Sequence, residues 1–333
     1  MSLESLLIKA NRIITRLSAA VFPMNRTLML IGVVLGICIR WLRNQRRKRS
    51  SALKGKTVVI NGVQSGIGMY TAFELGARGA TVVVVDCSDS CSSACANIID
   101  SRNGRAFCFS CDTSDEKMIQ DRLVTPLKRL LHEKQIGPVE LIIDVNVRPP
   151  CDAQLSPPLH KLPIDSIRRE FDVAAMGHFT VIKAFLSDMV ESNRGCVAIV
   201  SSSAAVTGVA NQVHFCANQF AAMGLTEALR VELREYGNIG VSVFWACVHL
   251  NMIDPIYHGE SFLSQSSCPR LRLQQAARDI VNGICEGQGT IYIPRYLRYI
   301  PSLRLISSAT VFHSICAALG LSGGHNLLSN LQD

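Results

Sequence analysis

Short runs of β-branched and apolar residues alternate with stretches of helical periodicity from residue 57 onward. The apolar character of these runs is nearly continuous, so both faces of the sheet they form must be covered. Strand–helix alternation of this kind is typical of a parallel sheet with helices on both sides. The sequence therefore predicts an α/β chain with a single doubly wound domain and a seven-stranded parallel sheet. The expected strands are 57–60, 81–86, 105–110, 139–144, 196–201, 241–246 and 290–293.

The first expected strand leads directly into NGVQSGIG (61–68), and a helical pattern follows. Glycines at this place allow a tight turn and let backbone N–H groups approach a pyrophosphate at the N-terminus of the helix. The spacing alone is a weak signal, and a tight turn without a ligand is the alternative. Its position between a strand and a helix is the one that a dinucleotide site requires. We predict a Rossmann-type domain whose nucleotide contacts include Gly62, Ser65, Gly66, Ile67 and Gly68.

Asp86 ends the second expected strand, 18 residues after Gly68. A carboxylate there can accept hydrogen bonds from both hydroxyls of an adenosine ribose, and it repels a 2′-phosphate. This favours NAD(H) over NADP(H); the alternative is a strand-end Asp that caps a turn. The third expected strand ends in CDTSDE (111–116), where Asp112 or Thr113 would meet the adenine. Ser114 is a candidate N-cap of the next helix.

The net charge of +8 comes entirely from the N-terminal end of the chain. Residues 1–56 contain 12 Lys and Arg residues and one acid, whereas residues 57–333 contain 22 basic and 25 acidic residues. There is no zinc-finger spacing and no basic face with interleaved aromatic residues. Nucleic-acid binding is therefore not expected.

An uninterrupted apolar run of 13 residues covers 27–39, and six basic residues follow between 40 and 49. Extended to residue 42, the run gives about 24 Å of helix, enough for a thin bilayer such as that of the endoplasmic reticulum. A cleaved signal peptide and a segment lying in the interface are the alternatives. The basic cluster holds the following chain in the cytosol. We expect a membrane-attached, cytosol-facing protein at the endoplasmic reticulum or a lipid droplet, with membrane lipid as a partner.

The thirteen cysteines are odd in number and scattered, which argues against a disulfide framework and favours reduced thiols in the cytosol. Cys87, Cys91 and Cys95 recur every four residues, which would align them on one face of a helix. Neither a histidine nor a fourth ligand is nearby. No metal site is expected.

These features together resemble the short-chain dehydrogenase/reductase superfamily, and within it the membrane-attached retinol dehydrogenase and 17β-hydroxysteroid dehydrogenase subgroup. The resemblance covers nearly the whole chain and implies a Rossmann fold that binds NAD(P). The expected organisation is a membrane segment over 1–50 (apolar core 27–42), a Rossmann domain over 51–300 and an apolar extension over 301–333. The segments that carry the resemblance, besides NGVQSGIG, Asp86 and CDTSD, are 177–190, 199–205, 220–233 and 291–303.

The resemblance implies four catalytic positions, and three of them carry residues that cannot do the family's chemistry. The proton-donating Tyr falls on Phe215, the Lys four residues later on Gln219, and the Asn that holds a relay water on Ala174. The Ser that polarises the substrate oxygen is present as Ser202. Phe has no ionisable proton, so acid–base catalysis at the substrate oxygen lacks its donor. Gln219 has no charge to offer, although its amide could still bond the nicotinamide ribose.

The departures gather at the nicotinamide end of the expected site. The family's Asn-Asn-Ala-Gly after the fourth strand is replaced by Asp144-Val145-Asn146-Val147, and the side chains of Val145 and Val147 could intrude. Val248 and Ile253 replace a Pro and a Thr after the sixth strand. His214 titrates in a useful range, but it would need a different substrate pose.

The leading expectation is a non-catalytic homologue that keeps NAD(H) binding and serves as a homo- or hetero-oligomeric partner or regulator of related dehydrogenases. The alternative is an NAD-dependent oxidoreductase that acts on a retinoid, steroid or other lipid alcohol by an altered mechanism. A third hypothesis is a module that binds a lipid-like small molecule without chemistry.

Overall fold

The computed structural model describes residues 53–87, 95, 97–99, 104–145, 157–237, 240–249 and 272–321. The chain divides into two compact units, Met1–Ser51 and Ala52–Asp333, and the second unit contains the sheet. The expected membrane segment (27–42), Cys91, Asn146, Val147 and Ile253 lie outside the described residues.

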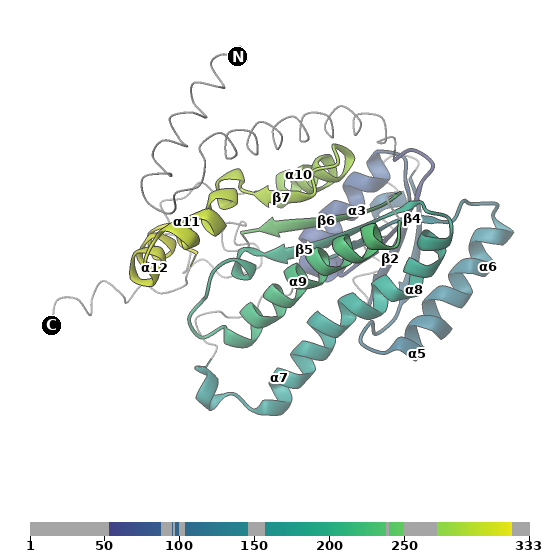
Figure 1. Ribbon diagram of the computed structural model, residues 1–333. Helices are drawn as coiled ribbons and strands as arrows, with labels where there is room; N and C mark the ends of the chain where they lie inside the picture. Colours follow the sequence, from purple (N-terminus) through teal and green to yellow (C-terminus); the bar gives the residue numbers. More distant parts are fainter. Residues whose placement is uncertain are drawn as a thin grey trace, which may run out of the picture. The chain divides into compact units, whose positions relative to one another are not determined.

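Seven parallel strands form one sheet in the order β3-β2-β1-β4-β5-β6-β7 (Figure 1). The predicted seven-stranded parallel sheet is therefore confirmed. Strands β1, β5 and β6 continue one or two residues beyond their expected carboxyl ends. The strands are β1 (Thr57–Asn61), β2 (Thr81–Asp86), β3 (Arg105–Ser110), β4 (Val139–Asp144), β5 (Gly195–Ser202), β6 (Val241–Val248) and β7 (Thr290–Ile293).

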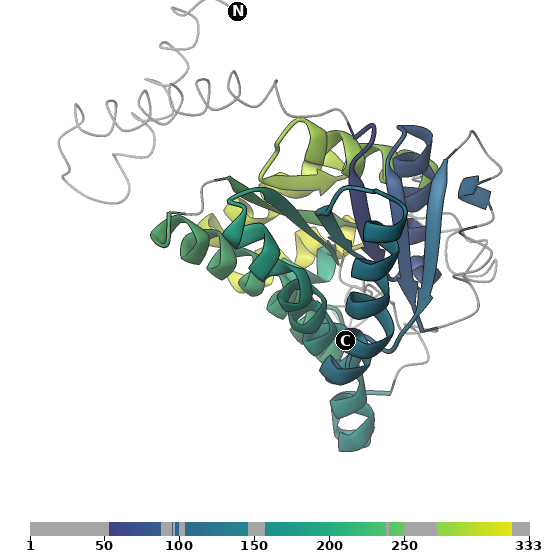
Figure 2. The same ribbon diagram turned by 90° about the vertical axis from the view of Figure 1, so that its right-hand side faces the viewer.

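Helices cover both faces of the sheet (Figure 1 and Figure 2). Alternate residues of a strand point to opposite faces, so Val58 and Ile60 pack beneath α3 and α10 while Val59 packs with α6, α8 and α9. The longer helices are α3 (Ile67–Ala77), α6 (Thr125–Glu133), α7 (Ile164–Phe171), α8 (Gly177–Glu191), α9 (Val213–Glu235), α10 (Leu273–Cys285), α11 (Ile300–Ile306) and α12 (Ala309–Ala318). Short α5 (Glu116–Ile119) joins α6 through a π turn, η2 (Gln120–Val124).

Parallel register brings the carboxyl ends of neighbouring strands together at one edge of the sheet. Asn61 at the end of β1 is the register partner of Val85 on β2 and of Asp144 on β4. Ser202 at the end of β5 is the partner of Val248 on β6. Residues from the nucleotide turn and from the family's catalytic positions therefore lie along the same edge, as open α/β sheets require of a ligand site.

The turn between β1 and α3 depends on two of its glycines. Gly66 has φ 70°, a left-handed conformation that residues with a side chain rarely adopt. A Cβ placed on Gly68 would lie 2.2 Å from the carbonyl oxygen of Gly62, which no side chain can tolerate. The helix can therefore begin this close to the strand only with glycine at position 68.

Among the described residues, one continuous helical stretch, Ile164–Glu191, has the length and hydropathy to cross a membrane. It consists of α7, a π turn (η4, Asp172–Met176) and α8. The α8 side chains Val181, Ile182 and Phe185 belong to the core beneath the sheet. The helix thus has a packing role within this domain.

Candidate functional site

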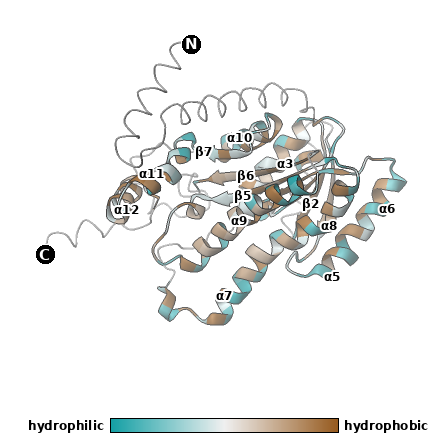
Figure 3. Cartoon of the chain, in the orientation of Figure 1, coloured by the Kyte–Doolittle hydropathy of each residue, from teal (hydrophilic) through white to brown (hydrophobic). Residues whose placement is uncertain are grey.

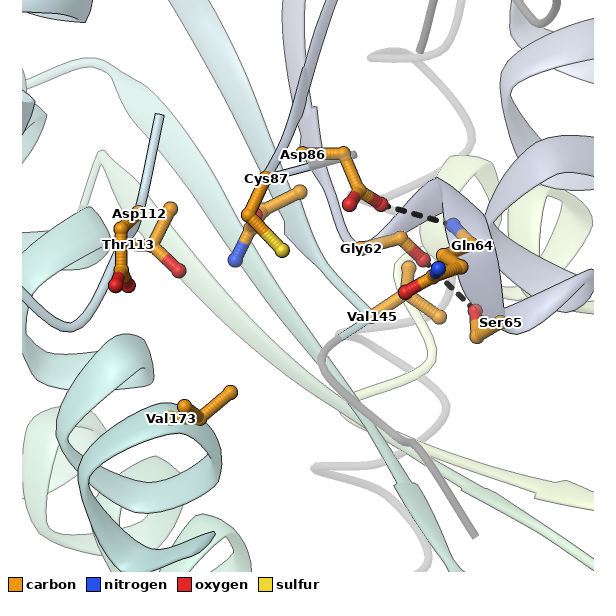
Figure 4. A pocket seen from close by; sticks show the side chains of 10 residues that line it. Gly62, Gln64, Ser65, Asp86, Cys87, Asp112, Thr113, Val145 and Val173 are labelled. Carbon is orange, nitrogen blue, oxygen red and sulfur yellow. Dashed lines mark hydrogen bonds between the residues drawn. The ribbon is translucent and has the colours of Figure 1, made fainter. Parts of the chain in front are cut away.

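A cleft of about 150 Å³ opens at the carboxyl ends of β1, β2 and β3 (Figure 4). The glycine turn lies on one side of it, the residues after β3 lie on the other, and Asp86 and Cys87 lie between them. This is the edge of the sheet at which the sequence predicts a nucleotide. The lining residues are Asn61, Gly62, Gln64, Ser65, Asp86, Cys87, Asp112, Thr113, Val145 and Val173.

Asp86 is the most buried carboxylate in the cleft lining, with 4% of its surface exposed. Its Oδ2 atom accepts a hydrogen bond from the backbone nitrogen of Gln64 at 2.9 Å (Figure 4). The carboxylate therefore holds the glycine turn against the end of β2 and at the same time presents negative charge to the cleft. Sequence reasoning missed the Gln64 contact because it uses a backbone N–H, which any residue type except proline would supply.

The Ser65 side chain makes two hydrogen bonds within the glycine turn. Its hydroxyl donates to the carbonyl of Gly62 at 2.8 Å and accepts from the backbone nitrogen of Gly68 at 3.1 Å. The side chain thus fixes the first turn of α3 on the strand, while its residue also lines the cleft. Of the five turn residues predicted to contact a nucleotide, Gly62 and Ser65 line the cleft.

Asp112 and Thr113 form the opposite wall. The Asp112 carboxylate accepts from both the backbone nitrogen and the hydroxyl of Ser114, at 2.9 and 2.7 Å. The Thr113 carbonyl accepts from the Thr180 hydroxyl on α8. The expected N-cap at Ser114 is wrong: Asp115 caps α5, because its carboxylate accepts from the backbone nitrogens of the next turn.

Ser202 and Gln219, two of the family's catalytic positions, are bonded to each other rather than turned toward the cleft. The amide oxygen of Gln219 accepts from the backbone nitrogen of Ser202 at 2.7 Å, and the two residues are 1% and 4% exposed. The Ser202 hydroxyl accepts from the backbone nitrogen of Ala204 at 3.2 Å. Both side chains therefore have structural partners, and neither lines the cleft.

Phe215, at the Tyr position, is a core residue. It lies on α9 four residues before Gln219 and is 4% exposed. It belongs to the same apolar cluster as Val145 and Val248, both of which are fully buried. A buried phenyl ring thus stands at the position where the family has its proton donor.

Ala174, at the Asn position, lies in the π turn η4 and is partly exposed. Its neighbour Val173 lines the cleft (Figure 4). Wide turns of this kind often mark functional sites. The backbone distortion is present in this chain, but a methyl group stands where the family has an amide.

His214, the candidate substitute acid–base group, pairs with Glu170 of α7. Its Nε2 atom lies 3.0 Å from the Glu170 carboxylate. Burial raises the pKa of Glu170, and His214 and the Asn218 amide partly offset that rise. His214 is 7% exposed and does not line the cleft, so the pair ties the start of α9 to α7.

A buried polar network that sequence reasoning missed lies directly behind the cleft. The Asp144 carboxylate accepts from the Asn61 amide at 3.0 Å through one oxygen and lies 2.9 Å from Nδ1 of His178 through the other. The three side chains are 3%, 0% and 1% exposed for Asn61, Asp144 and His178. The signal was available, because Asn61 and Asp144 end neighbouring parallel strands.

A second buried pair lies at the ends of β5 and β6. The Ser203 hydroxyl and Nδ1 of His249 are 3.1 Å apart. Burial lowers the pKa of His249 to about 4, so its imidazole is neutral at physiological pH. Nearby, the Trp245 indole donates to the Ser201 hydroxyl at 2.7 Å. These contacts give the serine run 201–203 structural partners.

The cysteines for which the structure gives positions carry free thiols. Burial raises the pKa of Cys111 to about 11 and of Cys95 to about 12, with the neighbouring Cys108 adding to the latter. Such thiols are protonated at neutral pH and are poor nucleophiles. Within the described ranges there is no group of three metal-ligating side chains.

Comparisons with known proteins agree with this geometry. The family model described as short chain dehydrogenase matches residues 56–254. Short-chain dehydrogenase/reductase family 16C member 6 of Bos taurus is 27% identical over 275 residues, which cover 82% of this chain and 83% of that protein. 17-beta-hydroxysteroid dehydrogenase 13 of Mus musculus is 27% identical (81% and 84% covered), and epidermal retinol dehydrogenase 2 of Mus musculus is 26% identical (76% and 78%).

Solved structures with the same fold include a metagenomic short-chain oxidoreductase in complex with NADP (TM-score 0.56, 21% identity, 73% of this chain and 98% of that chain covered). Another is a 3-oxoacyl-[acyl-carrier protein] reductase with bound NAD from Brucella melitensis (TM-score 0.58, 23% identity, 75% and 93% covered). The chain belongs to the short-chain dehydrogenase/reductase family. Among its relatives are retinol and 17β-hydroxysteroid dehydrogenases.

A nicotinamide dinucleotide, the cofactor that this family implies, fits the described residues at one end only. The glycine turn, Asp86 and the wall at Asp112 and Thr113 suit an adenosine diphosphate. At the other end, Phe215 and Gln219 are packed and bonded within the core. No acid–base step can be assigned to these residues.

Proposed function

We propose that this chain is a non-catalytic, membrane-attached member of the family that keeps the adenine-nucleotide end of its site and acts as a partner or regulator of related dehydrogenases. One observation carries the proposal. The positions that should donate and relay the proton are Phe215, Gln219 and Ala174, and the first two are sealed in the core. Loss of a positioned acid–base group alone costs about 10²–10⁴-fold in rate.

The nucleotide preference rests on Asp86. A buried carboxylate in the cleft favours ribose hydroxyls and repels a 2′-phosphate, so NAD(H) is preferred to NADP(H). No metal ion takes part in this proposal.

The membrane part of the proposal concerns the N-terminal apolar run with its basic flank, and also the surface of α11 and α12. Leu305 and Ile306 are 86% and 79% exposed, and Val311 is half exposed. Apolar colouring extends along these helices in Figure 3. The exposed cations Arg295, Arg298 and Arg304 accompany them, and residues 290–332 contain no acidic residue. Apolar side chains beside basic ones suit an anionic lipid surface, such as the cytosolic face of the endoplasmic reticulum or a lipid droplet.

The partner part of the proposal is supported by the outer face of the α7–α8 stretch. Ile164, Met176 and Phe179 are between 46% and 61% exposed there. Exposed apolar groups mark an interaction surface where they form a contiguous patch. We assign it to a second short-chain dehydrogenase chain, either a copy of this one or an active relative.

Turnover by purified full-length protein tests the proposal. The chain is incubated with NAD⁺ and a panel of retinoid, steroid and long-chain alcohols, beside epidermal retinol dehydrogenase 2 prepared in the same way. We expect no turnover above background with any substrate, while the relative turns over retinol. Robust turnover by the purified protein would end the non-catalytic assignment.

The alternative function is an oxidoreductase of a lipid alcohol with an altered mechanism. The His214–Glu170 pair, together with Ser202, is the feature that favours it. Activity that falls in both Ser202→Ala and His214→Ala would support this alternative. Activity unchanged in both would remove its candidate groups.

A further inference from the structure

Among the described residues, the lining of this cleft does not include the family's catalytic positions. Eight of its ten lining residues come from the ends of β1, β2 and β3 and the segments that follow them, and the remaining two are Val145 and Val173. Ser202, Phe215 and Gln219 are absent from the lining. In Figure 4 polar side chains lie on both sides of the cleft, and Val145 beside the glycine turn and Val173 on its helical turn are its two apolar residues from outside the first three strands.

The nicotinamide end of the site, which we call the closed end, is where Phe215, Gln219 and Val145 are buried in the core. Phe215, Val145 and Val248 share one apolar cluster and are between 0% and 4% exposed. The Gln219 amide is committed to the Ser202 backbone at 2.7 Å. Behind Val145, the Asp144 carboxylate is bonded on both oxygens to Asn61 and His178. A nicotinamide ring at Phe215 and Gln219 would have to compete with these contacts, because protein interiors are close-packed and contain few voids.

The open end has what an adenosine diphosphate requires. Asp86 offers a carboxylate, 4% exposed, to ribose hydroxyls. Gly62 and Ser65 line the cleft where α3, a helix of eleven residues, begins, so its N-terminal dipole favours a phosphate there. Two independent features therefore indicate an adenosine diphosphate. The buried carboxylate suits its ribose, and the helix N-terminus suits its phosphates.

We propose that the site recognises an adenine nucleotide through its adenosine diphosphate half alone, so that ADP-ribose or ADP is a complete ligand and the nicotinamide adds no affinity. This inference rests on the proposed function, since it concerns the same retained nucleotide site. It differs from the family's use of the site, in which the nicotinamide end is where the reaction takes place.

Isothermal titration of the full-length protein in detergent micelles tests the inference, with ADP-ribose, ADP, NAD⁺, NADH and NADPH as separate ligands. We expect ADP-ribose to bind within about threefold of NAD⁺ and NADH, and NADPH to bind at least about tenfold more weakly. NADH binding tenfold or more tighter than ADP-ribose overturns the inference but leaves the retained nucleotide site intact. Absence of binding by every nucleotide overturns both.

Two variants sharpen the comparison. Asp86→Asn keeps an acceptor for the Gln64 N–H but removes the charge, so it should weaken ADP-ribose and NADH by the same factor and reduce discrimination against NADPH. Phe215→Ala opens the closed end and should leave ADP-ribose binding within about twofold while NADH gains affinity. Asp165→Asn, on the exposed surface of α7, is the matched control and should change no affinity. Loss of NADH binding alone in Asp86→Asn would contradict recognition through the adenosine half.

Discussion

The amide oxygen of Gln219 accepts a hydrogen bond from the backbone nitrogen of Ser202 at 2.7 Å, and both residues are buried. This contact joins two positions that carry catalysis elsewhere in the family into one structural unit. The bond attaches the end of β5 to α9. Gln219, which stands where the family has a Lys, satisfies the buried N–H of Ser202.

Gln219→Ala should therefore destabilise the protein. The substitution leaves the Ser202 N–H without its acceptor, and an unsatisfied buried donor costs about 1–3 kcal/mol. Chemical denaturation of the full-length protein measures the free energy of unfolding. Gln274→Ala, on the exposed face of α10, is the matched control and should stay within about 0.5 kcal/mol of the parent. Equal effects at the two positions would show that the bond contributes nothing.

The network behind the cleft should be sensitive to loss of its central carboxylate. Asp144→Ala leaves Asn61 and His178 unpaired in the core, and removing one partner of a buried pair costs about 3–5 kcal/mol. Asp144→Asn should cost much less, because its amide oxygen can accept from Asn61 and its NH₂ can donate to Nδ1 of His178. Asp165→Ala breaks an exposed pair with Arg168 and should cost about 0–1 kcal/mol. If denaturation shows that Asp144→Asn is as damaging as Asp144→Ala, the charge itself is required.

Acid should weaken the fold through His249. Burial lowers its pKa from 6.5 to about 4 in the folded state, so the unfolded chain binds the extra proton between these values. Stability is therefore full above pH 6.5 and falls as the pH drops toward 4, by about 3 kcal/mol from this group. His249→Asn places an amide near the position of Nδ1 and should flatten the pH dependence of unfolding. His132→Asn, at an exposed histidine, should leave it unchanged.

The surface of α11 and α12 should bind anionic membranes without the N-terminal segment. The second compact unit, beginning at Ala52, is tested by flotation with vesicles of phosphatidylcholine, with and without phosphatidylserine. Three arginines at about 1 kcal/mol each predict roughly 100-fold stronger binding to the anionic vesicles. Leu305→Glu with Ile306→Glu should abolish most of it, whereas Val231→Glu, at another exposed valine, should not. Equal binding to neutral and anionic vesicles would contradict the charge argument.

The strands and the nucleotide turn could be predicted from the sequence because they follow from local rules. Continuous apolar runs predict a buried parallel sheet, and a glycine cluster between strand and helix predicts a tight turn at the edge of that sheet. The predicted strand bounds differ from the observed ones by at most two residues at either end. Asp115, and not Ser114, is the N-cap of α5. Both residue types can cap a helix, and the backbone angles at the start of the helix determine which of two adjacent residues does so.

The behaviour of the catalytic positions could be predicted only in part. The sequence shows that Phe215 and Gln219 lack the required groups, since that depends on residue type alone. It does not show that Gln219 turns away from the cleft to Ser202, because that choice depends on the spacing between β5 and α9. Sequence reasoning likewise missed the partners of Asp144. Asn61 lies beside it through the register of β1 and β4, and His178 reaches it from α8, which packs there only in the folded chain.

The filled nicotinamide end has a consequence for any return to catalysis. Phe215 and Gln219 are now members of the core, so changing Gln219 to Lys buries a cation and breaks the Ser202 bond before any rate is gained. Changing Phe215 to Tyr adds a hydroxyl to a side chain that is 4% exposed in an apolar cluster. Each of these single steps toward an active enzyme therefore lowers folding stability first. Catalytic residues at such a site are therefore easier to lose than to regain.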